Sequence, residues 1–236
     1  MDTTPITLST SNVLSIDRRG LSTAVTSRLR DMIVEGALAP GMRLNERILC
    51  EQLAVSRTPL REAFKTLAVE GLIELLPNRG AIVAEMSVTD IEQTFEVMSA
   101  LEGLSGQLAC QRITETEMAE IKALHYEMLA AHTRRDLPAY YRVNMAIHDR
   151  INAVADNAVL RATYQQINHR ILSLRFRSNF NQEKWDLAVK EHSAMIDALE
   201  RRDSEALRVV LQQHLLNKRN VVIADLMKHS SASNGN

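Results

Sequence analysis

The chain has 236 residues, of which 45% are hydrophobic, so it is long enough for one small and one larger domain, each with its own core. Its formal net charge is −1, which excludes a generally basic protein and means that any binding of nucleic acid needs a local cationic face. The two cysteines, Cys50 and Cys110, lack CxxC spacing, which argues against a disulfide scaffold and favours a reducing compartment.

The ends of the chain are polar. Residues 1–17 are rich in Thr and Ser and are expected to be a disordered arm, and residues 229–236 a disordered tail. No apolar run approaches the length of about 20 residues that crosses a bilayer, and no basic lead precedes an apolar block. We therefore expect a cytoplasmic protein with no membrane partner, divided into domains at residues 18–86 and 87–228.

Apolar spacing predicts two short amphipathic helices over residues 46–53 and 58–71. A short connection separates them, in which Ser56 is placed as an N-cap and Pro59 suits the first helical turn. This is the pattern of a helix-turn-helix, whose second helix presents its N-terminal edge to the major groove. Arg57 and Arg61 lie on that edge, and arginine can bond O6 and N7 of guanine together.

A β-hairpin is predicted directly after the second helix. Residues 72–76 and 81–83 fit two strands, joined by a turn over residues 77–80. Such a hairpin is the wing of a winged helix, and Arg79 at its tip can reach a groove or a phosphate.

Residues 29–83 resemble the winged-helix domain of the GntR family of bacterial transcription factors. The resemblance rests on APG at 39–41, VSRTPLREA at 55–63 and EGLI at 70–73. It implies that Arg57 and Arg61 contact base edges and that the remaining DNA contacts come from Arg47, Ser56, Thr58, Asn78, Arg79 and Gly80. Two alternatives stay open: Arg47 could be an ordinary surface charge, and Thr58 could simply cap its helix.

Beyond Met86 the sequence shows only helical periodicity, and it predicts an all-α antiparallel bundle of six helices. The fold class is therefore mostly α, a winged helix-turn-helix domain followed by this bundle. The expected helices cover about 87–112, 114–135, 136–155, 158–178, 182–202 and 204–227.

Three of these helices each place a histidine on the side that faces the core. His148 follows Asn144 by four residues, so the two side chains share one helix face, and His192 and His214 lie within apolar stripes of later helices. A single inward histidine is more often a hydrogen-bonded core residue. Three imidazoles with an amide oxygen are instead a ligand set for a divalent metal, with Zn²⁺ favoured and Ni²⁺ or Mn²⁺ as alternatives.

The bundle resembles the FCD domain, the all-α ligand-binding module of the FadR subfamily of GntR regulators. Its metal-binding members carry Asp-x3-His on one helix and single histidines on two later ones, which match Asn144, His148, His192 and His214. Asn144 replaces the more usual aspartate, which lowers the expected metal affinity. Met98 stands where many members have an arginine that holds the carboxylate of an effector.

Three arginines could supply the missing cation, namely Arg170, Arg175 and Arg177, although solvated surface positions are the favoured interpretation of all three. We accordingly name Met98, Arg170 and Arg175 as candidate effector-binding residues.

The sequence thus predicts a transcriptional regulator rather than an enzyme. It is expected to bind a pseudo-palindromic DNA operator as a homodimer and to sense a small organic acid near a metal. The main alternative is a metal-dependent enzyme that uses the three histidines, with Asp149 or Glu191 as the base, although their positions in sequence point them to another helix face. A redox sensor based on Cys50 is a further alternative, which lacks a resolving cysteine nearby.

Overall fold

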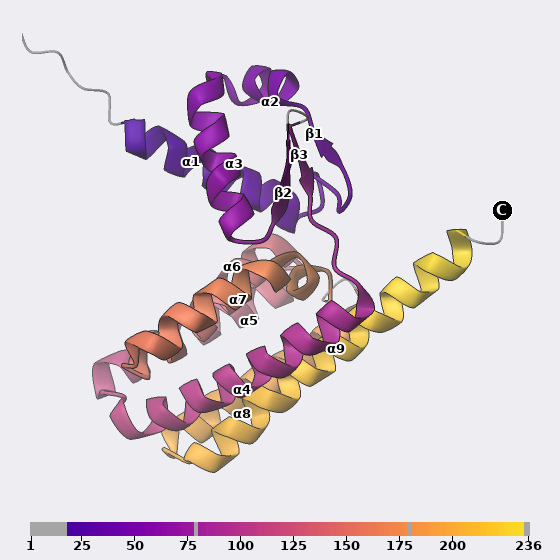
Figure 1. Ribbon diagram of the computed structural model, residues 1–236. Helices are drawn as coiled ribbons and strands as arrows, with labels where there is room; N and C mark the ends of the chain where they lie inside the picture. Colours follow the sequence, from indigo (N-terminus) through magenta and orange to yellow (C-terminus); the bar gives the residue numbers. More distant parts are fainter. Residues whose placement is uncertain (1–17, 78–79, 179–180, 234–236) are drawn as a thin grey trace, which may run out of the picture.

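A computed structural model describes residues 18–77, 80–178 and 181–233, which form a small N-terminal domain and a larger helical bundle (Figure 1). The expected arm, residues 1–17, lies outside the described residues. The small domain consists of α1 (Arg18–Val34), β1 (Arg43–Leu44), α2 (Glu46–Leu53), α3 (Arg57–Val69), β2 (Ile73–Leu76) and β3 (Gly80–Val83). The winged helix-turn-helix expected from the sequence is confirmed.

The wing contains one strand more than expected. β2 pairs antiparallel with β3, with Leu76 opposite Gly80, and the two-residue strand β1 pairs with the other edge of β3. Neither α1 nor β1 was predicted from the sequence. Both contribute to the core of the domain, since Leu29 of α1 and Leu44 of β1 are buried against Leu60 and Leu67 of α3.

The turn between α2 and α3 is fixed by local backbone interactions. The side chain of Asn45 caps α2, and Ala54 ends that helix in a left-handed conformation with φ of 52°. Val55 packs against the core between the helices. Ser56 occupies the expected N-cap position of α3, but its side chain makes no capping hydrogen bond.

The bundle is formed by six helices in the described residues: α4 (Val88–Arg112), α5 (Glu115–Thr133), α6 (Leu137–Val154), α7 (Ala158–Arg177), α8 (Gln182–Glu200) and α9 (Ser204–Ser233). Capping boxes begin α4 at Ser87 and α5 at Thr114. α9 continues past Met227 to Ser233, so the expectation of a disordered tail from residue 229 is wrong up to that residue. Residues 234–236 lie outside the described part.

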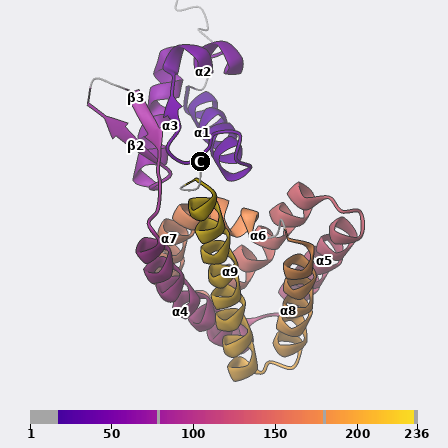
Figure 2. The ribbon, with the colours of Figure 1, turned by 90° about the vertical axis from the view of Figure 1, so that its right-hand side faces the viewer.

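In the bundle α9 packs between α4 and α8, and α6 and α7 close the far side (Figure 2). Two apolar clusters fill the interior, one around Ile121, Ile147 and Leu211 and one around Phe95, Ile171 and Leu215. None of the described helices is long and apolar enough to span a membrane.

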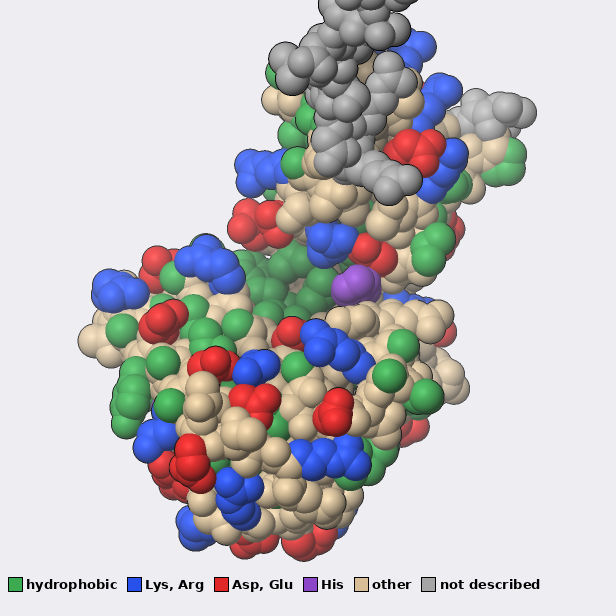
Figure 3. Space-filling view, turned by 90° about the vertical axis from the view of Figure 1, so that its left-hand side faces the viewer, with side chains coloured by type: hydrophobic (Ala, Val, Ile, Leu, Met, Phe, Trp, Pro, Cys, Tyr) green, Lys and Arg blue, Asp and Glu red, His purple; other side chains and the backbone are tan. Residues whose placement is uncertain are grey.

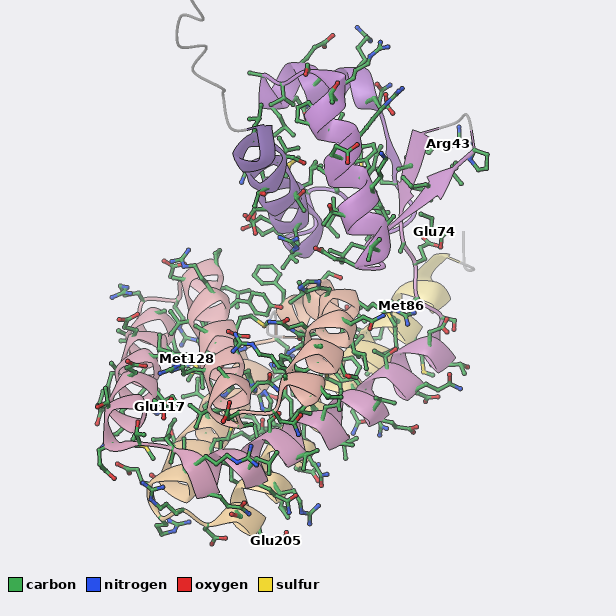
Figure 4. All side chains as sticks on the ribbon, turned by 60° about the vertical axis from the view of Figure 1, so that its left-hand side comes forward. Arg43, Glu74, Met86, Glu117, Met128 and Glu205 are labelled. Atoms are coloured by element: carbon green, nitrogen blue, oxygen red, sulfur yellow. The ribbon has the colours of Figure 1, made fainter. Side chains whose placement is uncertain are left out.

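The two domains meet where α1 and the end of α3 lie against α7. The surface is hollowed at this junction, and hydrophobic side chains are visible in the hollow (Figure 3). The chain itself passes between the domains at Met86 (Figure 4).

Candidate DNA-binding face and metal centre

The N-terminal end of α3 is open to solvent. Ser56, Arg57 and Thr58 are exposed, and no ion pair involves Arg57 in the described part of the chain. Because the Ser56 side chain makes no capping bond, its hydroxyl and the first amides of the helix can donate to a phosphate.

Arg61 and Arg47 are engaged within the protein. The guanidinium of Arg61 contacts the carboxylate of Glu46 at 3.0 to 3.1 Å, and this exposed pair raises the pKa of Arg61. Arg47 lies 3.3 Å from Glu51, one turn away on the same helix. To contact DNA, either arginine must therefore exchange its carboxylate partner for a group on the DNA.

The groove between α3 and the sheet adds a cation, Lys65, that was not predicted from the sequence. It is lined by Asn45, Glu46, Arg61, Lys65 and Gly80, among others. Asn78 and Arg79 at the expected wing tip lie outside the described residues. Figure 4 marks Arg43 and Glu74 on the strands that flank β3.

The three histidines of the bundle converge from three helices. His148 of α6, His192 of α8 and His214 of α9 are buried, and one ring nitrogen from each lies within 4.8 Å of the others. The Nε2 atoms of His148 and His192 are 3.2 Å apart. Two nitrogens on one tetrahedral zinc ion lie about 3.3 Å apart, given bonds of about 2.0 Å, so this spacing fits a shared metal.

The other ring nitrogen of each histidine faces an acceptor. Nδ1 of His192 donates to the carbonyl of Ala188 at 2.8 Å. Nδ1 of His214 lies 2.6 Å from Oε2 of Glu191, and Nδ1 of His148 lies 2.9 Å from Oε2 of Glu102, although the angles of this last contact are not those of a hydrogen bond. A proton on Nδ1 leaves the Nε2 lone pair for a metal, which is the usual arrangement of outer partners around metal-bound histidines.

Asn144 lies one helical turn before His148 on α6, on the same helix face. Its side chain is fully buried, and neither the oxygen nor the nitrogen of its amide has a hydrogen-bond partner in the described residues, as is also true of Nε2 of His214. Burial lowers the pKa of all three histidines, so their imidazoles are neutral at pH 7 and can ligate. Buried polar atoms without partners are costly, and a divalent cation would satisfy the two that offer lone pairs, Oδ1 of Asn144 and Nε2 of His214.

A buried arginine stands beside this cluster. Arg175 of α7 has no solvent exposure, and its Nη1 contacts Oε1 of Glu102 at 2.9 Å and Oδ1 of Asn168 at 3.0 Å. The expectation of a solvated surface charge is wrong for Arg175, because α4 and α7 enclose its side chain with a matching carboxylate. Burial would raise the pKa of Glu102, but its contacts with His148 and Arg175 lower it to about 2.

The other candidate effector residues differ from Arg175. Met98 is fully buried in the apolar cluster of α4, α7 and α9 and offers no polar group. Arg170 is exposed and lies against Gly71 between the domains. The side chain of Arg177 is not among those described.

Two further residues near the centre were not predicted as site residues. Glu191 contacts His214 and so lies beside the histidine cluster, contrary to the expectation that it faces away. Asp149, the other candidate base, is exposed and lies 4.0 Å from Arg161. Lys218, one turn after His214, is buried with Nζ 3.3 Å from Oγ of Ser178, and burial together with Arg175 lowers its pKa to about 7.

Cys50 and Cys110 are both free, the first half-buried and the second buried. Burial raises the pKa of the Cys110 thiol, which makes it less reactive.

Comparison with known proteins assigns both domains. Residues 21–83 match the model of bacterial regulatory proteins of the gntR family, and residues 93–217 match the FCD domain, which covers more than half of the chain. The chain is 27% identical over 187 residues to the HTH-type transcriptional repressor RspR of Escherichia coli, a match that covers 79% of this chain and 82% of the relative. It is 29% identical over 203 residues to the galactonate operon transcriptional repressor of Escherichia coli, covering 75% and 86% of the two chains.

The solved structure of E. coli McbR/YncC has the same fold, with a TM-score of 0.78 at 22% identity, and the match covers 87% of this chain and 98% of that one. Family and relatives indicate a regulator and not an enzyme. With its winged helix and its FCD bundle, the chain therefore belongs to the GntR family of bacterial transcriptional regulators.

Proposed function

We propose that this protein is a transcriptional repressor that binds a pseudo-palindromic operator as a homodimer in the bacterial cytoplasm, and that a small organic acid bound near a metal in the FCD domain controls it. The single observation that carries the regulatory part is the buried cluster of His148, His192 and His214 beside the unpartnered amide of Asn144. Repression is proposed because both relatives compared above are repressors.

The exposed end of α3 supports the DNA-binding part. Arg57 and Arg61 are proposed to read bases, while Arg47, Ser56 and Thr58 hold phosphates and the wing tip at Asn78, Arg79 and Gly80 makes further contacts. One short helix reads too few base pairs for useful specificity, so two copies related by a two-fold axis are expected on each operator.

The metal is proposed to be Zn²⁺, with Ni²⁺ or Mn²⁺ as alternatives, because three imidazoles and one oxygen suit all three ions. Asn144, His148, His192 and His214 would hold it. Once bound, the ion would supply positive charge and, by expanding beyond four ligands, a coordination position for an anionic ligand.

The charges around the cluster point to an acidic effector. Glu102 and Arg175 already offset each other, and Glu191 adds one carboxylate beside His214, so a divalent ion would still leave positive charge in a buried site. A carboxylate would balance it, and its remaining oxygens could be bound by Arg175 and by the protonated form of Lys218, which lie on two helices. One relative represses a galactonate operon, and galactonate is a hydroxy acid of this chemical class.

The proposal is tested with an operator selected from a random DNA library. Zn²⁺-loaded protein is screened by thermal shift against hydroxy acids and their uncharged sugars, for example galactonate against galactose. We expect at least one acid, and not its neutral partner, to raise the melting temperature, because a ligand that binds only the folded state stabilises it. The same acid should change operator affinity. Equal responses to acids and neutral sugars would contradict an anion-specific site.

A further inference from the structure

Helix α7 contacts both the buried centre of the bundle and the DNA-binding domain. Its inner face carries Asn168 and Arg175, and Arg175 donates to both Asn168 and Glu102 beside the histidine cluster. The residues that follow them directly in sequence, His169 and Phe176, face the DNA-binding domain. A movement of α7 at the buried centre is therefore also a movement at the domain junction.

The polar part of this junction is centred on Glu70, the residue that caps the C-terminus of the recognition helix α3. Arg30 of α1 holds its carboxylate through two contacts of 2.6 and 3.0 Å. Nδ1 of His169 lies 3.7 Å from Oε2 of the same carboxylate. One turn of α7 thus touches the end of the helix whose other end is proposed to read DNA.

The apolar part of the junction is a separate small cluster. Val34 at the end of α1 is buried with Tyr141 of α6 and with Leu172 and Phe176 of α7. The hydroxyl of Tyr141 donates to the carbonyl of Leu172 at 2.7 Å, and its ring meets that of Phe176 edge to face with centroids 5.1 Å apart. Gly71 adds a close approach, since a Cβ there would lie 3.1 Å from Cγ of Arg170.

We infer that α7 is the element through which occupancy of the buried centre changes operator affinity, by way of the contacts of His169 with Glu70 and of Leu172 and Phe176 with Val34. This inference rests on the proposed function, because it names how that same site is connected to DNA. It adds a specific set of coupling residues that lie in neither binding site.

The physical reason is the sharing of partners at Arg175. Arg175 and His148 both contact Glu102. A ligand that binds Arg175, or a metal that binds His148, therefore alters these contacts with Glu102 and with them the preferred position of α7. A packed helix interface has discrete arrangements, and a ligand shifts them only by binding one better than another. The partly exposed pair of His169 and Glu70 is expected to contribute little energy, so the cluster around Val34 carries most of the coupling.

The test breaks the junction without touching either binding site. The junction variant combines Val34→Ala with His169→Ala. The matched control combines Val159→Ala with Gln165→Ala, which remove the same valine methyl groups and a similar polar side chain from exposed positions on α7. Operator affinity is measured for each protein with and without Zn²⁺, and Zn²⁺ binding is measured by calorimetry on the same samples.

A second arm needs no metal. The paired substitution Glu102→Gln with Arg175→Met perturbs the buried centre without leaving one unpaired charge, and circular dichroism checks that the variant is folded. Its effect on operator affinity is compared in the wild-type and junction-variant backgrounds. The two arms separate a failure of metal binding from a failure of the coupling through α7.

We expect Zn²⁺ to change the operator affinity of the wild type and the control by about fivefold or more, the lower range of typical allosteric coupling. The junction variant should bind Zn²⁺ equally well and respond less than twofold, and it should also suppress the effect of the centre variant. A full response of the junction variant in either arm would overturn the role of α7. If Zn²⁺ does not bind the wild type, the proposed metal site fails, and the second arm alone decides the coupling.

Discussion

Nδ1 of His214 lies 2.6 Å from Oε2 of Glu191, and the two residues come from the neighbouring helices α9 and α8. Glu191 also accepts a hydrogen bond from the amide of Asn217. The carboxylate is thus held in place and fixes the orientation of the His214 ring. Nε2 of the ring is left buried without a protein partner among the described residues.

Glu191→Gln should lower metal affinity by about 10- to 100-fold, the usual effect of removing an outer partner of a metal-bound histidine. The glutamine side chain has the same size as glutamate, but its neutral amide oxygen is a weaker acceptor for Nδ1 of His214. Competition with a chromogenic chelator measures the change. Glu183→Gln, an exposed acid on the same helix, is the control, and an equal loss in both variants would contradict a specific role for Glu191.

Arg57→Ala and Arg61→Ala should each weaken operator binding by about 1–3 kcal/mol and relax base preference at one position of each half-site. Arg61 pairs with Glu46 in the structure and must leave this carboxylate to reach a base. Glu46→Gln removes the competing carboxylate and not the base contact, so this variant should keep the sequence preference of the wild type. Selection of binding sites from random DNA measures the preference.

Arg47→Ala provides the comparison for these base-reading variants, because its proposed role is a phosphate contact. It should lower affinity for all sequences alike and flatten the salt dependence. If Arg57→Ala instead lowers the affinity for all DNA sequences alike, Arg57 contacts phosphate, as Arg47 is proposed to do, and does not read a base.

Lys218 makes stability depend on pH. Burial lowers its pKa from 10.5 to about 7, so between these values the unfolded chain binds more protons than the folded one. The free energy of unfolding contributed by this group therefore rises with pH across that window. Urea unfolding of metal-free protein should show that Lys218→Met is stabilising near pH 6.5 and that its advantage over the wild type shrinks toward pH 9.5. The exposed Lys228→Met should show no such trend.

Light scattering at micromolar concentration should give the mass of a homodimer, and a reducing agent should not change it, since Cys50 and Cys110 are free thiols. The physical reason is the need for two recognition helices on a two-fold operator. A monomer that retains full operator affinity would contradict this prediction.

Much of the fold could be predicted because its local signals are strong. The capping residues at Ser87 and Thr114 mark helix starts that the structure confirms, and the turn at Ala54–Ser56 separates α2 from α3 as expected. The short strand β1 was missed because two residues carry no alternation pattern. The extension of α9 was missed because its last turns lack apolar periodicity.

The inward histidines could also be predicted, since helical spacing places His148, His192 and His214 on core-facing stripes. The burial of Arg175 could not, because an arginine is usually solvated and its partner Glu102 lies on a helix far away in sequence. One signal was present: Tyr164, Asn168, Ile171 and Arg175 share one face of α7 at helical spacing. Glu191 was misplaced because a neighbouring helix, α9, occupies the side to which it points.

The measurement that tests the central claim most directly is the metal content of protein purified without a histidine tag and reconstituted with Zn²⁺. We predict one ion per chain in the wild type, loss of that ion in His148→Ala and His192→Ala, and tighter binding in Asn144→Asp, because a charged oxygen is the stronger ligand. Substoichiometric metal in the wild type, with both histidine variants indistinguishable from it, would show that these residues are hydrogen-bonded core histidines and not a metal centre.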